Sequence, residues 1–529
     1  MLDKVFRFFR TVIHLKPVQI GYQICYRLCP GRGLKKIRKG RSVKFSPVTT
    51  KLRFIKWIDK PVSLNGTYTF LNQTIRIDDS SDLLNSSRLW QYNFMYMDYL
   101  LQPGLDTGTG LELIRDFSMK FRSVEAAFEP YPISLRCVNW IKFLNSNDNL
   151  SGTFRDKEDI VSDLYNQYRF LTKRPEYHLL GNHLLENGIS LLFGAFFFHS
   201  FSFYTKAKKI LLKELEEQIL SDGAHFELSP MYHQIILDRI LDSVNLLKSN
   251  RLFNDQEQLL SVLIDRASLM LGWLKEITFS DGNIPLVNDS AKGIAPDTKS
   301  LLEYASALNL MPAEIQLKEC GYRMFRNGNY ELFVDYGIPG PDYIPGHAHS
   351  DIFSFVLYHK GVPVIVDTGV TTYQAGSTRS FERSTRAHNT VMVNGKEQSE
   401  MWGSFRVGRR ARPVLTSETK SFIEGYHKGF SPFVHTRSFE VTGSKIILCD
   451  RLNRHDGSGS AFLHFSPGLN PEIRGSSIHC NDIHFNIDRA ESITTELYNA
   501  SLGFNMAESA TKVIIKFKEN LTTTIDFPA

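Results

Sequence analysis

The sequence changes its periodicity once, close to Cys320, and this change constrains the fold more than any other feature. Between about residues 85 and 315, seven segments carry apolar residues at the spacing of amphipathic or fully buried helices. After Cys320 the chain consists of short segments rich in β-branched and aromatic residues, separated by Gly, Asn, Asp and Ser. The pattern therefore predicts a domain of packed helical hairpins followed by an antiparallel β-sandwich-like domain.

The same patterns predict three regions. Residues 1–84 are expected to form a basic amino-terminal arm and short strands that lead into the helical domain. Residues 85–320 are predicted to form the helical domain, and residues 321–529 the β-sandwich domain. Asn327 and Gly328 lie between two alternating runs and predict a hairpin turn at the start of the β-domain.

Charge is distributed unevenly along the chain. The net charge is +6, but residues 1–41 hold eleven Lys or Arg against the single acid Asp3, so the remainder is slightly acidic. A basic arm of this kind suits weak contact with an acidic membrane surface or an anionic polymer, and it equally suits a solvated helix face. Nucleic acid is not an expected partner, because the arm contains no recognised binding module.

Six scattered cysteines form no paired motif, which suits a reducing compartment. The first residues lack the apolar stretch of a secretory signal, because arginines interrupt every apolar run. The most apolar window, residues 189–204, is too short and too interrupted to span a bilayer. We therefore expect a cytoplasmic protein, with membrane association through the basic arm as an open alternative.

Three histidines and one aspartate lie among strand-like runs in residues 345–393, namely His347, His349, His388 and Asp367. His349, Asp367 and His388 provide two nitrogens and one oxygen, a donor set that suits zinc with a water in the fourth position. His347 precedes His349 by two residues, so both point to the same side of a strand. The alternative is that these are unrelated polar residues of a β-sheet.

Two further motifs lie at predicted helix starts. In residues 181–188, Asn182, His183 and Glu186 gather at the beginning of an otherwise apolar helix, where they are either functional or simply capping and core groups. In residues 221–234, Ser229 is a suitable N-cap and Pro230 suits the first helical position. Tyr232 then lies in the first turn, where the helix dipole favours the phenolate that a general base needs. The alternative is an aromatic ring that only packs.

Taken in order, several motifs resemble the heparinase II/III polysaccharide lyases, most closely those associated with bacterial surface-polysaccharide gene clusters. The motifs are LWQYNFMYMDYL, YPISLRCVNWI, NHLLENG, DGAHFELSPMYH, DGNIPLVNDS, HAHSD, VDTG and RAHNTV. The resemblance implies an incomplete (α/α) toroid followed by antiparallel β-sheets in a sandwich. It also implies cleavage of acidic, uronate-containing polysaccharides by β-elimination.

The resemblance further implies roles for individual residues. Asn182 and His183 would stabilise the charge that develops on the uronate, and Tyr232 or His183 would take the C5 proton. Tyr232 would then protonate the leaving oxygen, and His347 would line the same cleft from the β-domain. The zinc would be structural and would fix the strand that carries His347. The residues expected to contact the sugar or to orient the histidines are Tyr92, Asn93, Arg136, Asn139, Trp140, Glu186, Glu227 and Tyr373.

Two other functions remain open at this stage. Glu186 and Glu227 could serve as the carboxylate pair of a toroid glycoside hydrolase. A non-catalytic glycan-binding or assembly protein could also retain a lyase fold. The double bond formed by β-elimination absorbs in the ultraviolet, so the product distinguishes a lyase from both alternatives.

Overall fold

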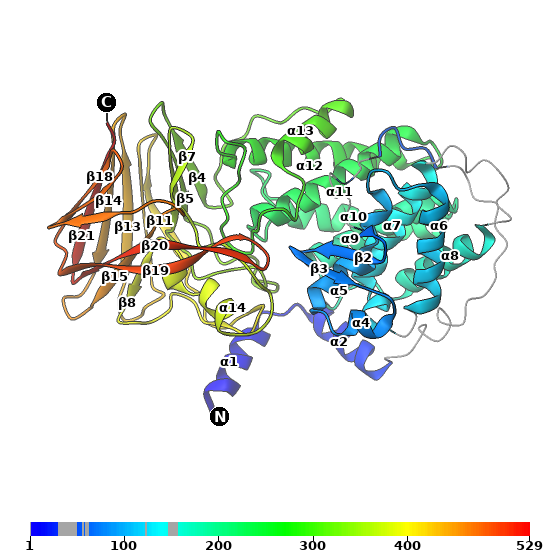
Figure 1. Ribbon diagram of the computed structural model, residues 1–529, viewed down its shortest axis with the longest axis horizontal. Helices are drawn as coiled ribbons and strands as arrows, with labels where there is room; N and C mark the ends of the chain where they lie inside the picture. The colour runs from blue at the N-terminus through cyan, green and yellow to red at the C-terminus, as the bar shows by residue number, and fades with distance from the viewer. Residues whose placement is uncertain are drawn as a thin grey trace.

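The computed structural model describes residues 2–29, 50–55, 58, 63–121, 124–146 and 157–528. The basic run at residues 30–41, which belongs to the predicted arm, lies outside these residues. In the described chain, a helical part and a sheet-rich part lie side by side along the long axis of the molecule (Figure 1).

The amino-terminal region contains two helices and a small sheet. Helices α1 (Leu2–Val12) and α2 (Pro17–Leu28) lie along the lower edge of the molecule in Figure 1. Strands β1 (Ser63–Leu64), β2 (Thr67–Phe70) and β3 (Gln73–Arg76) form an antiparallel sheet and are the short strands predicted for this region.

The helical domain contains all seven helices that the apolar periodicity predicts. Its members are α4 (Ser80–Leu84), α5 (Arg88–Tyr96), η1 (Asp98–Leu101), α6 (Thr107–Lys120), η2 (Glu125–Phe128), α7 (Pro130–Ser146), α8 (Glu158–Lys173), α9 (Gly181–Phe197), α10 (Phe201–Gln218), α11 (Pro230–Ser249), α12 (Gln256–Ile277) and α13 (Thr298–Ala307).

Helix α9 is the centre of the helical domain, since it packs against α7, α8, α10 and α11. Nearly all of its side chains are buried, which explains why its sequence is apolar on every side. Gly194 permits this packing, because a Cβ there would lie 2.6 Å from the Tyr168 ring. The helix is therefore held firmly by its neighbours along its length.

The β-domain is antiparallel throughout its named strands. One four-stranded sheet has the order β4-β5-β6-β7, another has β19-β20-β15-β8, and an eight-stranded sheet has β11-β12-β13-β14-β21-β18-β17-β16. The hairpin predicted at Asn327 and Gly328 joins β4 to β5. The predicted fold class, an incomplete toroid followed by an antiparallel β-sandwich domain, is confirmed.

The bounds of these strands are as follows: β4 (Tyr322–Arg326), β5 (Tyr330–Asp335), β6 (Phe355–His359), β7 (Val362–Ile365), β8 (Val391–Val393), β9 (Met401–Trp402), β10 (Arg406–Val407), β11 (Pro413–Glu418), β12 (Phe422–His427), β13 (His435–Val441), β14 (Lys445–Leu452), β15 (Gly459–His464), β16 (Glu472–Arg474), β17 (Ser477–Cys480), β18 (Ile483–Asp488), β19 (Ser492–Gly503), β20 (Met506–Phe517) and β21 (Asn520–Asp526). The short helices α14 (Ser377–Glu382) and η5 (Thr385–Ala387) lie between β7 and β8.

An apolar cluster joins the two domains. Trp273 and Phe279, from the end of α12 and the segment after it, pack in this cluster with Tyr322, Phe333 and Tyr358 of the β4–β7 sheet. The rings of Phe279 and Tyr358 stack with centroids 4.0 Å apart. This contact fixes the sheet against the helical domain and so brings residues from both domains to one site.

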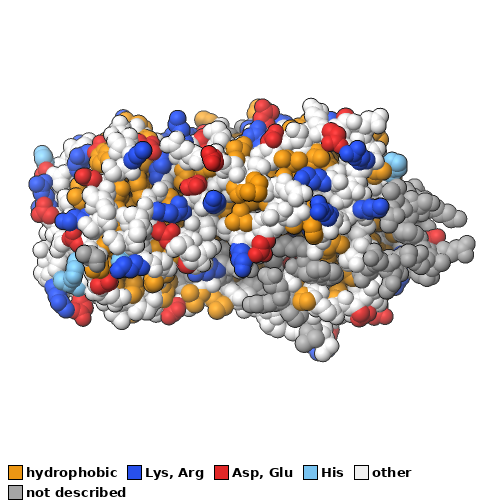
Figure 2. All heavy atoms as spheres, turned by 90° about the horizontal axis from the view of Figure 1, so that it is seen from above, with side chains coloured by type: hydrophobic (Ala, Val, Ile, Leu, Met, Phe, Trp, Pro, Cys, Tyr) orange, Lys and Arg blue, Asp and Glu red, His pale blue; other side chains and the backbone are white. Residues whose placement is uncertain are grey.

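The surface carries charges of both signs. Figure 2 shows Lys, Arg, Asp and Glu side chains interspersed over the face that is seen from above. Within the described ranges, no helix is both long enough and apolar enough to cross a bilayer.

Candidate active site

The candidate site lies where the start of α11 meets the loop that contains His347. The rings of Tyr232 and His347 stack with centroids 3.9 Å apart and planes inclined by 30°. The Tyr232 hydroxyl lies 3.4 Å from the hydroxyl of Tyr373, which belongs to the β-domain. The structure thus brings together Tyr232, His347 and Tyr373, which the sequence analysis assigned to one site.

The backbone of Tyr232 is held by the helix start that the sequence predicted. Ser229 is the N-cap of α11, its hydroxyl accepts a hydrogen bond from the Tyr232 amide, and Pro230 is the first helical residue. The Ser229 hydroxyl also donates to the carbonyl of Asp289 at 3.0 Å. The start of α11 is therefore tied to the loop at residues 281–296.

The expectation of a phenolate at Tyr232 is wrong. Burial raises the pKa of Tyr232 well above its ordinary value, and the neighbouring Tyr373 hydroxyl raises it further. Near a helix start the dipole favours an anion, but its effect is smaller than the cost of burying a charge. Tyr232 is accordingly a neutral phenol, which suits a proton donor.

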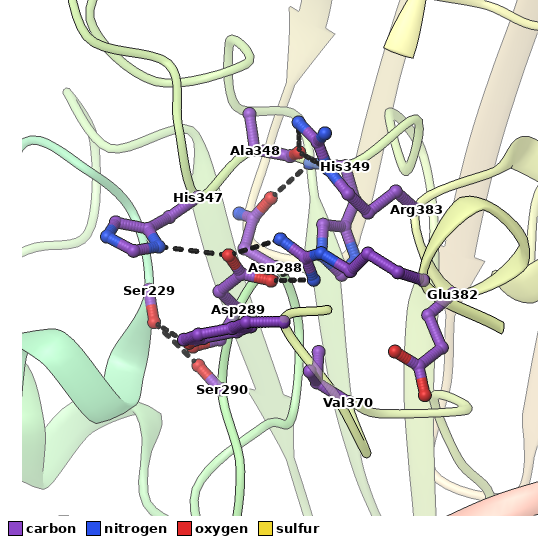
Figure 3. A network of polar contacts seen from close by, with 12 residues as sticks. Ser229, Asn288, Asp289, Ser290, His347, Ala348, His349, Val370, Glu382 and Arg383 are labelled. Atoms are coloured by element: carbon purple, nitrogen blue, oxygen red, sulfur yellow. Dashed lines mark hydrogen bonds and ion pairs between the residues drawn. The ribbon is translucent and has the colours of Figure 1, made fainter. Parts of the chain in front are cut away.

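A buried carboxylate that the sequence analysis missed holds the histidines of the site in place. Asp289 is fully buried and accepts hydrogen bonds from His347 Nδ1 and His349 Nε2, both at 2.9 Å, and from Arg379 (Figure 3). Burial alone would raise the pKa of Asp289, but the Arg379 charge and the histidine hydrogen bonds hold it well below its usual range. The loop at residues 281–296 therefore reaches the β-domain and is not a simple linker.

The hydrogen bond to Asp289 fixes the orientation of His347. Because an ionised carboxylate can only accept, Nδ1 donates to Asp289, and Nε2 is the ring nitrogen that faces Glu227. The Nε2 atom lies 3.4 Å from Glu227 Oε2, and the other oxygen of Glu227 accepts the backbone amide of Asn182 at 3.4 Å. Burial raises the pKa of Glu227. The sequence-based expectation that Glu227 orients a histidine agrees with this contact.

The start of α9 approaches Glu227 closely because of its glycine. Gly181 has a φ of +58°, and a Cβ on it would lie 2.9 Å from Ile344 and 3.1 Å from Glu227 Oε1. Leu180, which precedes it, also has a positive φ of 64°. Strained backbone of this kind persists where the surrounding structure enforces it, and it is common at functional sites.

His183 has a carboxylate partner that differs from the predicted one. Its Nδ1 lies 3.2 Å from Glu176 Oε1, whereas Glu186 lies 3.6 Å from Arg239 instead. Burial lowers the pKa of His183, but the charge of Glu176 and its hydrogen bond raise it more, so the net shift is upward. His183 lies beside the Tyr131 ring with 31% of its side chain exposed, and its raised pKa favours the cationic form.

Three of the predicted sugar contacts are wrong, because their side chains belong to the core of the helical domain. Arg136 is 1% exposed, and its guanidinium donates to Gln167 and to backbone carbonyls. Trp140 is fully buried, with Nε1 3.1 Å from the sulfur of Met97. Asn139 is buried and donates to the Tyr96 carbonyl at 2.9 Å. Helix α7 is buried on nearly all sides, including the positions of its polar residues.

A row of partly exposed rings leads towards His183. Ring centroids are 6.4 Å apart from Tyr92 to Tyr96, 6.0 Å from Tyr96 to Tyr131 and 4.6 Å from Tyr131 to His183. Tyr92 was predicted to contact sugar, whereas Tyr96 and Tyr131 were missed, although Tyr92 and Tyr96 have helical i, i+4 spacing. Asn93 bonds to the Leu89 carbonyl of its own helix.

The predicted zinc ligands are close together but do not form a ready-made set. The rings of His349 and His388 have centroids 5.2 Å apart, while Asp367 accepts a hydrogen bond from His388 Nδ1 at 2.7 Å. The buried atoms that find no hydrogen-bond partner within the described chain include three of this group, namely His349 Nδ1, His388 Nε2 and Asp351 Oδ2. Across the described residues, no three His, Cys, Asp or Glu side chains are arranged to hold a metal. The donor chemistry nevertheless suits a divalent metal, with Asp367 orienting His388.

Two sequence models of one protein family match this chain. Residues 122–318 match the model described as "Heparinase II/III N-terminus", and residues 311–527 match "Heparinase II/III-like, C-terminal". The chain belongs to the heparinase II/III family. The two matched regions contain Tyr232 and His347 respectively, so each family domain provides one ring of the stacked pair.

Curated family relatives are heparin-sulfate lyases. One from Pedobacter heparinus is 25% identical over 298 residues, which cover 49% of this chain and 43% of the relative. One from Bacteroides stercoris is 22% identical over 320 residues, covering 55% of this chain and 46% of the relative. The chain thus aligns with less than half of the length of each of these relatives.

Solved structures of the family share the fold over nearly the whole chain. A structure of heparinase III aligns with a TM-score of 0.64 and 14% identity, covering 96% of this chain and 91% of that one. A mutant of a heparan sulfate lyase from Pedobacter heparinus aligns with a TM-score of 0.61 and 16% identity, covering 93% of this chain and 87% of that one. At these identities the likeness concerns the fold.

Proposed function

We propose that this heparinase II/III family protein is a polysaccharide lyase that cleaves an acidic, uronate-containing polysaccharide by β-elimination. The observation that carries the proposal is the stacked pair of Tyr232 and His347, with Asn182 and His183 at the nearby start of α9. The heparin-sulfate lyases that align with half of this chain support the same reaction class. A role in bacterial surface-polysaccharide metabolism is part of the proposal and rests on the resemblance of the motifs.

The first requirement of the reaction is that the uronate carboxylate is neutralised, because the C5 proton is otherwise too weakly acidic to remove. The cationic ring of His183 and the amide of Asn182 provide opposite charge and hydrogen-bond donors for this purpose. Both residues lie in the first turn of α9, where the helix dipole also favours an anion.

The second requirement is a base for the C5 proton, and His347 meets it. Nδ1 donates to Asp289, so the neutral form of the ring would carry its lone pair on Nε2, where it can accept a proton. When Nε2 takes the proton, the resulting imidazolium lies between the carboxyl groups of Asp289 and Glu227, which stabilise its charge.

The third requirement is an acid for the leaving glycosidic oxygen. Tyr232 is stacked on His347 and is neutral because burial raises its pKa, so its hydroxyl can donate a proton. This assignment differs from the sequence-based one, in which Tyr232 was a candidate for both base and acid. The Tyr373 hydroxyl, 3.4 Å away, is placed to supply a hydrogen bond to the Tyr232 oxygen as that proton leaves.

The row of Tyr92, Tyr96 and Tyr131 offers a surface along which the polymer can bind. Aromatic rings stack against the apolar faces of pyranose rings, and these three lead from α5 towards His183. We place the sugars that precede or follow the cleaved bond along this row.

We also propose a structural zinc ion beside the reaction centre. His349 through Nδ1 and His388 through Nε2 would hold it, because these buried nitrogens have no other partner in the described chain. Asp367 would orient His388, and the unpartnered oxygen of Asp351 is an additional donor. When bound, zinc would fix His349 and hence the neighbouring His347.

A panel of uronate polymers tests the proposed reaction. The purified protein is incubated with heparan sulfate, unsulfated heparosan, hyaluronan, chondroitin and alginate, and both ultraviolet absorption and new reducing ends are measured. A lyase produces both signals, and a His347→Ala variant produces neither. Reducing ends without absorption would indicate the hydrolase, and polymer binding without any product would indicate the non-catalytic alternative.

A further inference from the structure

Helices α1 and α2 present an unusual apolar surface. Of the twenty-one large hydrophobic side chains that are exposed in the described chain, eight lie within residues 5–28. Isolated exposed hydrophobics are normal, but a contiguous group of this kind marks an interaction surface. The group consists of Val5, Phe6, Phe8, Phe9, Ile13, Ile20, Ile24 and Leu28, and it is called the amino-terminal apolar surface below.

Helix α1 is docked by its polar face, which leaves the apolar face outside. Arg7 and Arg10 donate to Glu400 at 3.1 and 3.0 Å, and Thr11 accepts a hydrogen bond from the Trp402 indole at 3.1 Å. These residues have the three- and four-residue spacing of one helix face. Val5 and Phe9 belong to the opposite face, which explains why they remain exposed.

Helix α2 repeats the arrangement. Gln19 donates to the carbonyls of Leu179 and Tyr343, and the Tyr26 hydroxyl donates to the carbonyl of Pro175 at 2.7 Å. The opposite stripe consists of Ile20, Ile24 and Leu28 at spacing of four, and all three are exposed. An ordinary surface helix buries its apolar stripe against the core. Helices α1 and α2 instead turn their polar faces to the protein and their apolar faces to the solvent.

The charge around this surface is basic. Residues 2–29 contain five Lys or Arg and one acid, Asp3, and the side chains of Arg7 and Arg10 remain 39% and 47% exposed although they pair with Glu400. A helix with phenylalanines on one face and cations on the other lies in the interface of an anionic membrane, with the apolar face among the acyl chains. A second copy of this chain fits less well, because like charges would face one another across the contact.

We propose that α1 and α2 dock the protein on an anionic phospholipid membrane through the amino-terminal apolar surface. The docking holds the enzyme at a bilayer without spanning it. It is independent of the proposed lyase reaction, because neither helix contributes a residue to the site around Tyr232 and His347.

Flotation with lipid vesicles tests the docking on the full chain. The protein is mixed with vesicles of phosphatidylcholine alone or with about one third phosphatidylglycerol, and the bound fraction is measured at low and high salt. We expect binding to the anionic vesicles, reduced by high salt because salt screens the attraction to the headgroups.

Variants assign the binding to the apolar surface. Phe9→Asp in α1 should lower the affinity for anionic vesicles by at least ~10-fold, because it places a charge in the apolar face. Leu497→Asp, at a side chain that is 75% exposed on β19, is the matched control and should bind like the wild type. Ile24→Asp makes the same test in α2. If Phe9→Asp does not fold, the binding of Ile24→Asp decides the question, and the reverse also holds.

Three results would overturn the proposal. One is the absence of binding to anionic vesicles, and another is equal loss of binding in Phe9→Asp and Leu497→Asp. The third is a dimer that Phe9→Asp dissociates, seen by light scattering in a protein that does not bind vesicles. Turnover of a soluble polymer should be the same in Phe9→Asp and in the wild type, which separates this proposal from the proposed reaction.

Discussion

Asp289 and Arg379 form an ion pair that is entirely removed from solvent, with Nη2 and Oδ2 2.7 Å apart and both side chains fully buried. The aspartate belongs to the loop after α12, and the arginine belongs to α14 of the β-domain. The same carboxylate accepts hydrogen bonds from His347 and His349. One buried charge pair thus connects the two domains and orients the ring that we propose as the base.

Removal of the negative charge from this pair should be costly. Asp289→Asn leaves Arg379 buried without its counter-ion, so we expect a loss of about 3–5 kcal/mol in the free energy of unfolding. Chemical denaturation followed by circular dichroism measures it. The matched control is Asp116→Asn, at a 47%-exposed carboxylate that pairs with the equally exposed Lys120, where the loss should be below about 1 kcal/mol. Equal effects of the two substitutions would contradict the assigned role of Asp289.

The helices that hold the site residues could be predicted from the sequence, whereas the side chains that these residues contact could not. Periodicity located α9 and α11, and capping chemistry located Tyr232 within the first turn of α11. The partner of His347, however, lies 58 residues away in a loop with no periodic pattern. Such a contact is set by how the domains pack, which no local sequence signal encodes.

Burial explains the remaining errors. Arg136 and Trp140 have the residue types of a sugar-binding surface, yet α7 lies inside the helical domain and both side chains are buried. The position of Tyr232 at a helix start was inferred correctly from the local sequence. The larger effect of burial on the pKa of Tyr232 depends on the β-domain, which covers this tyrosine. Local effects could be predicted from the sequence, and tertiary effects that oppose them could not.

Removal of the Tyr232 hydroxyl should abolish most activity without unfolding the protein. For Tyr232→Phe we expect kcat to fall by at least ~100-fold, the lower range for loss of an acid–base group. Tyr373→Phe removes only the hydroxyl beside it and should cost less than ~10-fold. Ultraviolet assays give both values, and near-normal turnover in Tyr232→Phe would assign the acid to another residue.

The contact of His183 with Glu176 makes a prediction about pH. Since the folded pKa of His183 is raised, its charge stabilises the protein below the unfolded pKa of 6.5, and this contribution is lost as pH rises through the folded value. The cation that binds the uronate is lost over the same range, so kcat/KM should decline on the alkaline side. Glu176→Gln should move this alkaline decline to lower pH, as pH profiles of the two proteins would show. An unchanged profile would contradict a cationic role for His183.

The proposed zinc can be tested without any activity assay. Protein purified without chelator should contain about one zinc per chain by elemental mass spectrometry, and a strong chelator should lower its thermal midpoint. His349→Ala and His388→Ala should each lose the metal. The control His479→Ala, at a partly exposed histidine on β17, should retain it. Metal-free wild-type protein, or equal metal content in all four proteins, would contradict the site.

Gly181 provides the sharpest test of how the start of α9 is built. Gly181→Ala places a Cβ in a backbone conformation with φ of +58°, which costs about 1–2 kcal/mol for a residue with a side chain. The same Cβ would lie 2.9 Å from Ile344 and 3.1 Å from Glu227, so it should also displace the carboxylate beside His347.

Gly282→Ala is the matched control, because Gly282 has a φ of +88° but no heavy atom within 4 Å of the added Cβ. Both substitutions should destabilise the protein through backbone strain, but only Gly181→Ala should also lower kcat/KM. We expect that loss to be at least ~10-fold, since misplacement of a catalytic group by a fraction of an ångström to an ångström weakens proton transfer strongly. Denaturation and ultraviolet assays of the two variants separate strain from misplacement. Equal activity of the two variants would show that Glu227 does not position His347.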